Sequence, residues 1–226
     1  MIRTIREPKP PQAARPTPAA PVAVTPATAL ANVLVGSALA AVFTLLVVHY
    51  SLTRGKLIVP AHYDDVTYLR DGLDKLDGFY KGGLPGIVGR VSLRPPHSPF
   101  STSLAFTGYA LFGIHDWAPY AGNAIVILAL LALVDFATHG MRPWQQVIAG
   151  MFVLTIPISA QAVYEFRSDL WVGVLTAAVI VLLLEQPLVR ASRAYLAWTG
   201  IVAGVALLSK TSIFPVTLGL CGSALF

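Results

Sequence analysis

Residues 29–52 form an uninterrupted run of 24 residues that contains no Asp, Glu, Lys or Arg. As a helix this run is about 36 Å long, which is enough to cross a hydrocarbon core of about 30 Å. A helix on the surface of a soluble domain keeps one polar face, whereas this run is mainly apolar on every side. The run therefore predicts a transmembrane helix.

The rest of the chain is also poor in charge. Of the 226 residues, 55% are hydrophobic and 12% are charged, whereas soluble domains carry about 25% charged residues. A soluble core of this size cannot hide so much apolar surface, so a secreted domain, a cytosolic enzyme and a nucleic-acid reader are excluded as first interpretations. The single cysteine, Cys221, excludes an internal disulfide and a cysteine metal cluster.

Further apolar runs follow residue 117, and we expect four of them to span the membrane: 119–138, 146–163, 170–184 and 194–209. Pro157 lies inside the second of these and predicts a kink, because proline cannot donate the helical hydrogen bond. A last run, 213–226, is about 21 Å long as a helix and too short to cross, so we expect the N-terminal part of a longer protein. The predicted fold class is all-α, a polytopic transmembrane helix bundle over residues 28–226.

Two regions lie outside these runs. Residues 1–27 hold seven prolines and four basic residues, a composition that predicts a disordered tail. Residues 53–117 form a long polar loop, in which 64–79 has apolar residues at helical spacing and predicts an interfacial helix. Residues 100–114 predict a second interfacial or re-entrant helix, and Gly/Pro-rich turns separate the two.

Basic residues in the short loops predict the orientation. With the tail in the cytoplasm, the tail and inner loops carry seven basic residues and the outer short loops carry two. The loop residues are Arg142, Arg190 and Arg193 inside, and Arg167 and Lys210 outside. Arg54 and Lys56 argue in the other direction. We expect a multi-pass protein of a bacterial inner membrane, with loop 53–117 on the outer face.

The acidic pair Asp64-Asp65 follows the first span by about a dozen residues. Adjacent carboxylates repel each other, so such a pair favours a bound cation or one carboxyl held protonated for acid–base chemistry. The alternative is a helix N-terminus, where the helix dipole favours Asp. The sequence alone leaves both interpretations open.

Three motifs in a fixed order resemble those of the GT-C membrane glycosyltransferases. They are residues 62–65 (HYDD), 94–100 (RPPHSPF) and 203–211 (AGVALLSKT). An acidic pair after the first span, an interfacial helix, a Pro-rich turn with His and closely spaced spans follow one another as in the branch that contains protein O-mannosyltransferases and aminoarabinose transferases. The chain departs from that pattern in two places: His97 follows Pro-Pro, and Asp65 stands where Glu is common.

The resemblance implies transfer of a sugar from a polyprenyl-phosphate carrier to a glycan, lipid or protein acceptor, with inversion at the sugar carbon. It makes Asp64 the general base. It makes Asp65 either the group that orients Asp64 or a ligand of a divalent metal, and it implies no other cofactor. Membrane lipid is the further partner, and nucleic acid is not one.

The resemblance also implies that Lys210, Arg94 and His97 hold the carrier phosphate and that Asp169 faces the active-site cavity. Simpler roles compete with these. Asp169 is also placed to cap a helix, and Lys210 to extend from the end of a span to the interface. The rival function is a non-catalytic membrane protein, either a transporter or an assembly subunit with a large outer loop.

Overall fold

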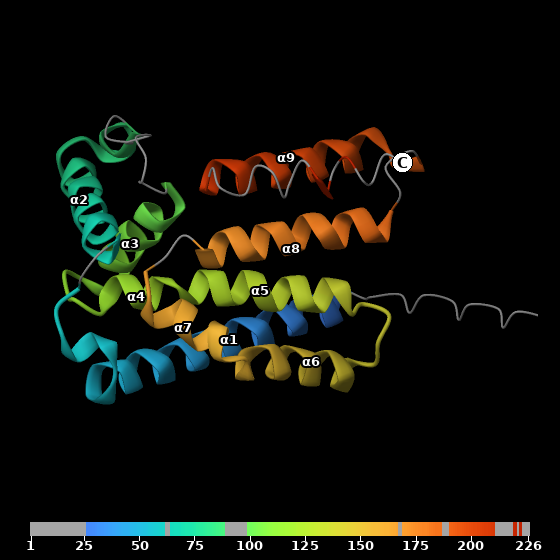
Figure 1. The fold of residues 1–226 in the computed structure, drawn as a ribbon, viewed down its shortest axis with the longest axis horizontal. Coiled ribbons are helices and arrows are strands. Elements are labelled where there is room, and N and C mark those ends of the chain that lie inside the picture. Colours follow the sequence, from blue (N-terminus) through green and yellow to red (C-terminus); the bar gives the residue numbers. More distant parts are fainter. Residues whose placement is uncertain are drawn as a thin grey trace, which may run out of the picture.

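The computed structural model describes residues 26–61, 64–88, 99–166, 169–186, 190–210, 219–220 and 222. In these residues the protein is all-helical and has no strand, as predicted. Its elements in chain order (Figure 1) are α1 Pro26–Arg54, η1 Lys56–Ile58, α2 Asp64–Val88, α3 Pro99–Phe112, α4 Ala118–Gly122, α5 Ala124–Ala137, α6 Pro143–Thr155, α7 Pro157–Tyr164, α8 Asp169–Glu185 and α9 Arg193–Ser209.

Two helical segments of the described chain, Ala31–Arg54 and Ala118–Ala137, are long and apolar enough to cross a membrane. The bent pair α6 and α7 makes a third if both halves belong to one span. These segments identify a membrane protein. Helices α8 and α9 coincide with the last two predicted spans, but they are shorter apolar helices, so their crossing of the bilayer stays a prediction.

The predicted kink at Pro157 is a complete break between two helices. Helices α6 and α7 meet at 63°, and Ile156 between them is extended. Proline fits the first position of α7 because the N–H that it lacks has no partner in a first helical turn. The Ser159 hydroxyl donates a hydrogen bond of 2.7 Å to the carbonyl of Val153, which supplies a partner where the helical ladder stops.

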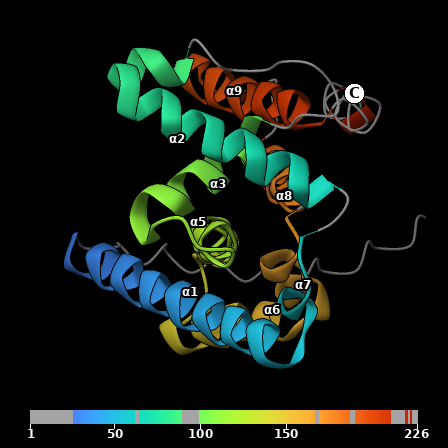
Figure 2. The same cartoon turned by 90° about the vertical axis from the view of Figure 1, so that its left-hand side faces the viewer.

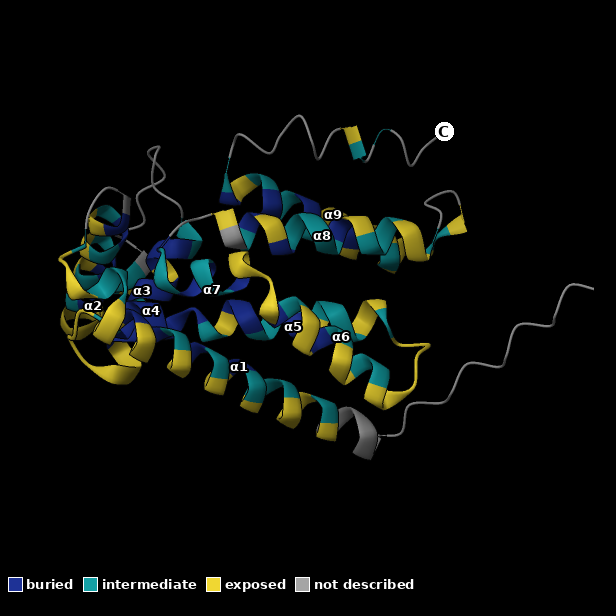
Figure 3. Ribbon diagram, turned by 60° about the horizontal axis from the view of Figure 1, so that its bottom comes forward, coloured by how far each residue is buried: buried dark blue, intermediate teal, exposed yellow. Residues whose placement is uncertain are grey.

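Helix α5 lies in the middle of the bundle, and α1 lies at its edge. Helices α1, α6 and α8 all contact α5, and α9 packs on α8 (Figure 1). In the most apolar part of each span, 39% of the residues are buried in Ala118–Ala137 but only 17% in Ala31–Arg54. Figure 3 shows exposed residues along α1, where Val33, Leu34 and Leu46 lie uncovered. Such a face is suited to contact with lipid chains.

Helices α2 and α3 cover one end of the bundle. In Figure 2, α5 is seen end-on whereas α2 is seen along its length, so α2 crosses the direction of α5. Helix α2 continues to Val88, beyond the expected end at residue 79, with a break at Gly83. Gly83 has φ 63°, a conformation that favours glycine, and the chain turns there before the helix resumes. The interfacial placement of α2 and α3 stays a prediction.

Many buried residues lie around α3, α4 and α7 (Figure 3). They include the fully buried Tyr120, Val163 and Phe166. Gly108 of α3 touches the backbone of α4, because a Cβ placed on it would lie 2.3 Å from the carbonyl oxygen of Ala118.

Several predictions concern residues outside the described ranges. The Pro-rich tail lies there except for its last two residues, Pro26 and Ala27, which belong to α1. The Pro-Pro turn with Arg94 and His97 lies there too, as do Cys221 and most of the run 213–226. The domain boundaries therefore stay predictions.

Candidate functional site

The candidate residues that the structure describes gather at one end of the bundle. Asp65 lies in the first turn of α2, Asp169 begins α8, and Lys210 follows α9 (Figure 1). Arg94 and His97 lie outside the described residues, and so does the side chain of Asp64, although Asp64 is the first residue of α2. Helix α2 begins at the acidic pair, so the helix N-terminus that the sequence left open as one interpretation is present.

Asp65 is a buried carboxylate with partners from three other segments. The residue is 2% exposed. Its Oδ2 accepts hydrogen bonds of 3.0 Å from the Lys56 ammonium and 3.0 Å from the Tyr120 hydroxyl. Its Oδ1 accepts one of 3.2 Å from the backbone N–H of Phe166. A buried charge is tolerated only when it is paired and hydrogen-bonded, and Asp65 is both.

This coordination favours an orienting role for Asp65 over a metal ligand. Both carboxylate oxygens already accept hydrogen bonds, and Oδ2 also contacts the Lys56 ammonium, so a divalent ion at Asp65 would lie close to a fixed positive charge. The described part of the chain also brings together no group of three or more His, Cys, Asp or Glu side chains. Asp65 as found therefore does not fit a metal site.

Aromatic packing fixes the Phe166 amide in place. The Phe166 ring meets the Tyr120 ring edge-on with centroids 5.7 Å apart, and the Tyr68 ring lies 6.5 Å away on a tilt. Tyr68 belongs to the first turn of α2 after Asp65, so the same helix contributes both the carboxylate and part of the packing. Such aromatic pairs add about 0.5–1.5 kcal/mol each beyond the burial of their area.

A second buried side chain holds the end of α7. Asn123, the residue between α4 and α5, donates a hydrogen bond of 2.9 Å from Nδ2 to the carbonyl of Val163. Asn123 is itself buried. Sequence reasoning did not select Asn123, because an asparagine within an apolar run gives no local indication of its partner.

Asp169 and Lys210 form an ion pair with each other. Their side chains are 59% and 40% exposed, so the pair lies at the surface, where such pairs contribute little to stability. The resemblance had given the two residues separate roles, with Lys210 at the carrier phosphate and Asp169 facing the cavity. The structure joins the two residues, so Asp169 competes with any other anion for the Lys210 ammonium.

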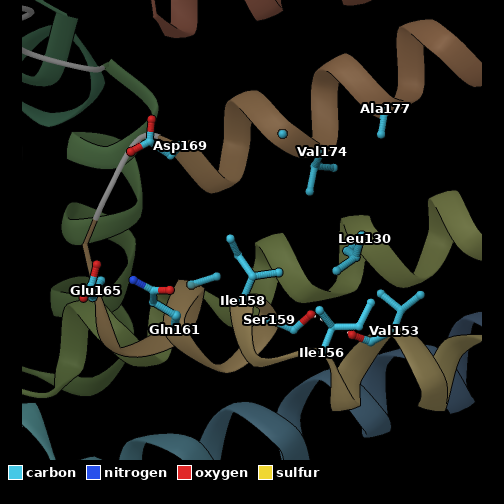
Figure 4. A pocket seen from close by; sticks show the side chains of 12 residues that line it. Leu130, Val153, Ile156, Ile158, Ser159, Gln161, Glu165, Asp169, Val174 and Ala177 are labelled. Atoms are coloured by element: carbon cyan, nitrogen blue, oxygen red, sulfur yellow. Dashed lines mark hydrogen bonds between the residues drawn. The ribbon is translucent and has the colours of Figure 1, made fainter.

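A pocket of about 410 Å³ lies between α5, α6, α7 and α8 (Figure 4). Most of its lining is apolar and includes Leu130, Val153, Ile158 and Val174. Its other lining residues include Gln161, Glu165 and Asp169, which lie together at one end (Figure 4). We call these three residues the polar end of the pocket.

The sequence indicated part of this pocket. From its polar end the sequence analysis selected Asp169, and the structure adds Glu165. Pro157 is the sequence feature that could have indicated the cavity. Its break diverts α7 from the direction of α6, and residues of both helices then line the space in front of α8.

Two titratable groups at the same end of the molecule are shifted by burial. Burial lowers the pKa of Lys75 on α2, and the negative charge of Asp71 partly offsets this effect. Burial raises the pKa of Tyr109 on α3 to about 12, and the charge of Asp116 acts in the same direction. Both groups are held in their neutral form more strongly than in water.

No family model matches the chain, and comparisons with curated proteins and with solved structures find no match either.

Proposed function

We propose that the protein transfers a sugar from a polyprenyl-phosphate carrier to an acceptor at the outer face of a membrane. The observation that carries this proposal is the pocket, which is apolar along the helices and polar at the end where Asp65 and Lys210 lie. A lipid-linked sugar has a long apolar chain and a hydroxyl-rich sugar, and the carboxylates and amide at the polar end can hydrogen-bond to those hydroxyls, while the phosphate needs the cation Lys210 beside Asp169. Binding sites for such ligands combine an apolar lining with a few placed polar groups.

In this proposal Asp64 is the general base. It removes the proton from the acceptor hydroxyl as that oxygen attacks the sugar carbon, and the bond from that carbon to the carrier phosphate breaks. The phosphate leaves with the bonding electron pair, so one displacement gives inversion and needs one base. Asp65 orients the start of α2, where Asp64 lies.

Lys210 binds the carrier phosphate in exchange for Asp169. A charge-assisted contact between ammonium and phosphate is strong where water is scarce. Arg94 and His97 extend this phosphate site in the proposal. The negative charge of Asp169 then faces away from the phosphate, which gives the ion pair two states, one with the donor bound and one without it.

The proposed location is a bacterial inner membrane with the N-terminus in the cytoplasm. The directions of the helices support this orientation. The C-terminal ends of α1 and α9 and the N-terminal end of α8 all lie at the end of the bundle where α2 and α3 lie (Figure 1). Loop 53–117 and Lys210 then face the same compartment.

The test is Asp64→Asn in a transfer assay with a polyprenyl-phosphate-linked sugar and the protein in vesicles. We expect transfer to fall by about 10²–10⁴-fold, the usual contribution of a general base, while membrane insertion is unchanged. Asp116→Asn is the matched control, because it removes one exposed carboxylate between α3 and α4. Normal transfer by Asp64→Asn would remove Asp64 as the base.

The rival, a transporter or assembly subunit, predicts that no polyprenyl phosphate is retained by the purified protein. It also predicts tolerance of alanine at the acidic pair, but the burial of Asp65 limits that comparison to Asp64. Alanine at position 65 would leave the Tyr120 hydroxyl and the Phe166 amide without their acceptor whatever the function is.

A further inference from the structure

Residues 163–166 are the last two residues of α7 and the two that follow it. Side chains from two distant segments hold them. Asn123 binds the carbonyl of Val163, and Asp65 binds the N–H of Phe166. Carbonyl groups in the last turn of a helix lack helical partners, and an N–H beyond the helix end lacks one as well. Here both groups are satisfied by side chains that are themselves buried.

One residue between these two contacts and one directly before them line the pocket. Glu165 lies at the polar end, and Ala162 lines the wall directly before Val163. Neither Asp65 nor Asn123 lines the pocket, so each reaches the pocket only through the backbone that it holds. The contacts span 101 and 40 residues of sequence, which makes them tertiary links between separate helices.

We propose that Asp65 and Asn123 are positioning residues that clamp segment 163–166 and thereby fix the polar end of the pocket relative to the start of α2. The inference deepens the proposed function, on which it rests for the identity of the ligand. Asp65 belongs to the same helical turn as Asp64, so this carboxylate keeps the general base in register with the donor site.

Such a clamp matters because transfer needs the acceptor oxygen in line with the bond that breaks. A misplacement of about 1 Å costs on the order of 10²-fold in rate, even when no reacting group is altered. The helix break at Pro157 leaves α7 without a continuous helix on its N-terminal side. Segment 163–166 therefore depends on contacts from other segments for its position.

The experiment compares Asp65→Asn and Asn123→Ala with the unmodified chain, each in lipid nanodiscs. Hydrogen exchange is followed in peptides that cover segment 163–166 and in peptides from α9. We expect exchange in segment 163–166 to rise about 10-fold or more in both variants, with little change in α9. If the two residues only stabilised the fold, exchange in α9 would rise as well and the melting temperature would fall.

Binding and catalysis are measured on the same samples. We expect the affinity for farnesyl phosphate, a short isoprenoid phosphate, to fall about 10-fold in both variants. In the transfer assay we expect kcat to fall by about 10²-fold while KM for the acceptor stays within about twofold, since the clamp alters geometry and leaves the acceptor contacts in place. The double variant should lose no more affinity and kcat than the more impaired of the two single variants, because both substitutions act on one segment.

Asn32→Ala is the matched control. Asn32 also makes a side-chain hydrogen bond between helices, from Nδ2 to Asp135 at 3.3 Å, but it links α1 to α5 and does not line the pocket. It should change neither exchange in segment 163–166 nor binding. If Asp65→Asn does not fold, Asn123→Ala alone decides, because it removes one neutral hydrogen bond and no charge.

Unchanged exchange in segment 163–166 would overturn the clamp, and so would raised exchange with unchanged binding of farnesyl phosphate. Failure of the proposed function has a different signature. The unmodified chain would then bind no farnesyl phosphate and transfer no sugar, while the exchange pattern would still decide whether Asp65 and Asn123 hold the segment.

Discussion

Replacing Gly108 by alanine tests the closest contact between two helices at the candidate site. The added Cβ would lie 2.3 Å from the carbonyl oxygen of Ala118 and 2.7 Å from the Cα of Pro119, whereas ordinary contacts begin at 3.4 Å. Both neighbours are backbone atoms, so no side chain can rotate away. Helices α3 and α4 would have to separate by about 1 Å, and overpacking of this kind costs about 1–3 kcal/mol.

The expected result is a lower melting temperature in detergent, followed by intrinsic fluorescence. For a chain of this size 1 kcal/mol corresponds to about 2–4 °C, so we expect a decrease of about 2–12 °C. Tyr120 lies two residues after Ala118, so the separation also weakens the hydrogen bond of its hydroxyl to Asp65. Binding of farnesyl phosphate should therefore weaken together with stability.

Gly200→Ala in α9 is the control, because a Cβ there meets no atom within 4 Å. Alanine is favoured over glycine inside a helix by about 0.5–1 kcal/mol, so this variant should melt at the same temperature or slightly higher. A Gly108→Ala protein that melts like the control would show that α3 and α4 are not in contact at this point.

Substitutions at two further positions test the break between α6 and α7 and the buried lysine. Ser159→Ala removes the hydroxyl that binds the Val153 carbonyl at the break, and we expect it to lower the free energy of unfolding by about 1–3 kcal/mol. Ser159→Thr keeps a hydroxyl and should lose less. Equal melting temperatures for the two variants and the unmodified protein would contradict this. Lys75 is 6% exposed and its pKa lies below 10.5 in the folded state, so between these two pKa values the unfolded state binds more protons and stability rises with pH. Lys75→Met should therefore melt higher than the unmodified protein at pH 7, with a difference that shrinks towards pH 10.5, and a difference that does not depend on pH would refute this explanation.

The sequence predicted the features that local residue patterns determine. The run 29–52 is uncharged over its whole length and lies within α1, and Pro157 marks the break between α6 and α7 because a missing N–H acts on its own helix. The extent of α2 was not predicted correctly. The Gly/Pro-rich stretch after residue 79 indicated a turn, yet helix resumes after Gly83, because one residue with positive φ is enough to turn the chain.

The contacts of the candidate site could not be predicted in the same way. Of the partners of Asp65, Lys56 is nine residues away in the sequence, but Tyr120 and Phe166 are 55 and 101 residues away. No periodicity of the chain connects such positions, because they meet through the packing of α2, α4 and α7. The same holds for Asp169 and Lys210, which are 41 residues apart and were expected to act separately.

The spread of the Asp65 partners along the chain also sets an order of assembly during synthesis. Lys56 emerges from the ribosome before Asp65, whereas Phe166 follows Asp65 by 101 residues, or by about 5–20 s at ordinary rates of translation. Throughout that interval Lys56 is the only one of the three partners that is certain to be available. The ion pair with Lys56 is thus the first contact of the site that can form, because Tyr120 and Phe166 are both synthesised after Asp65.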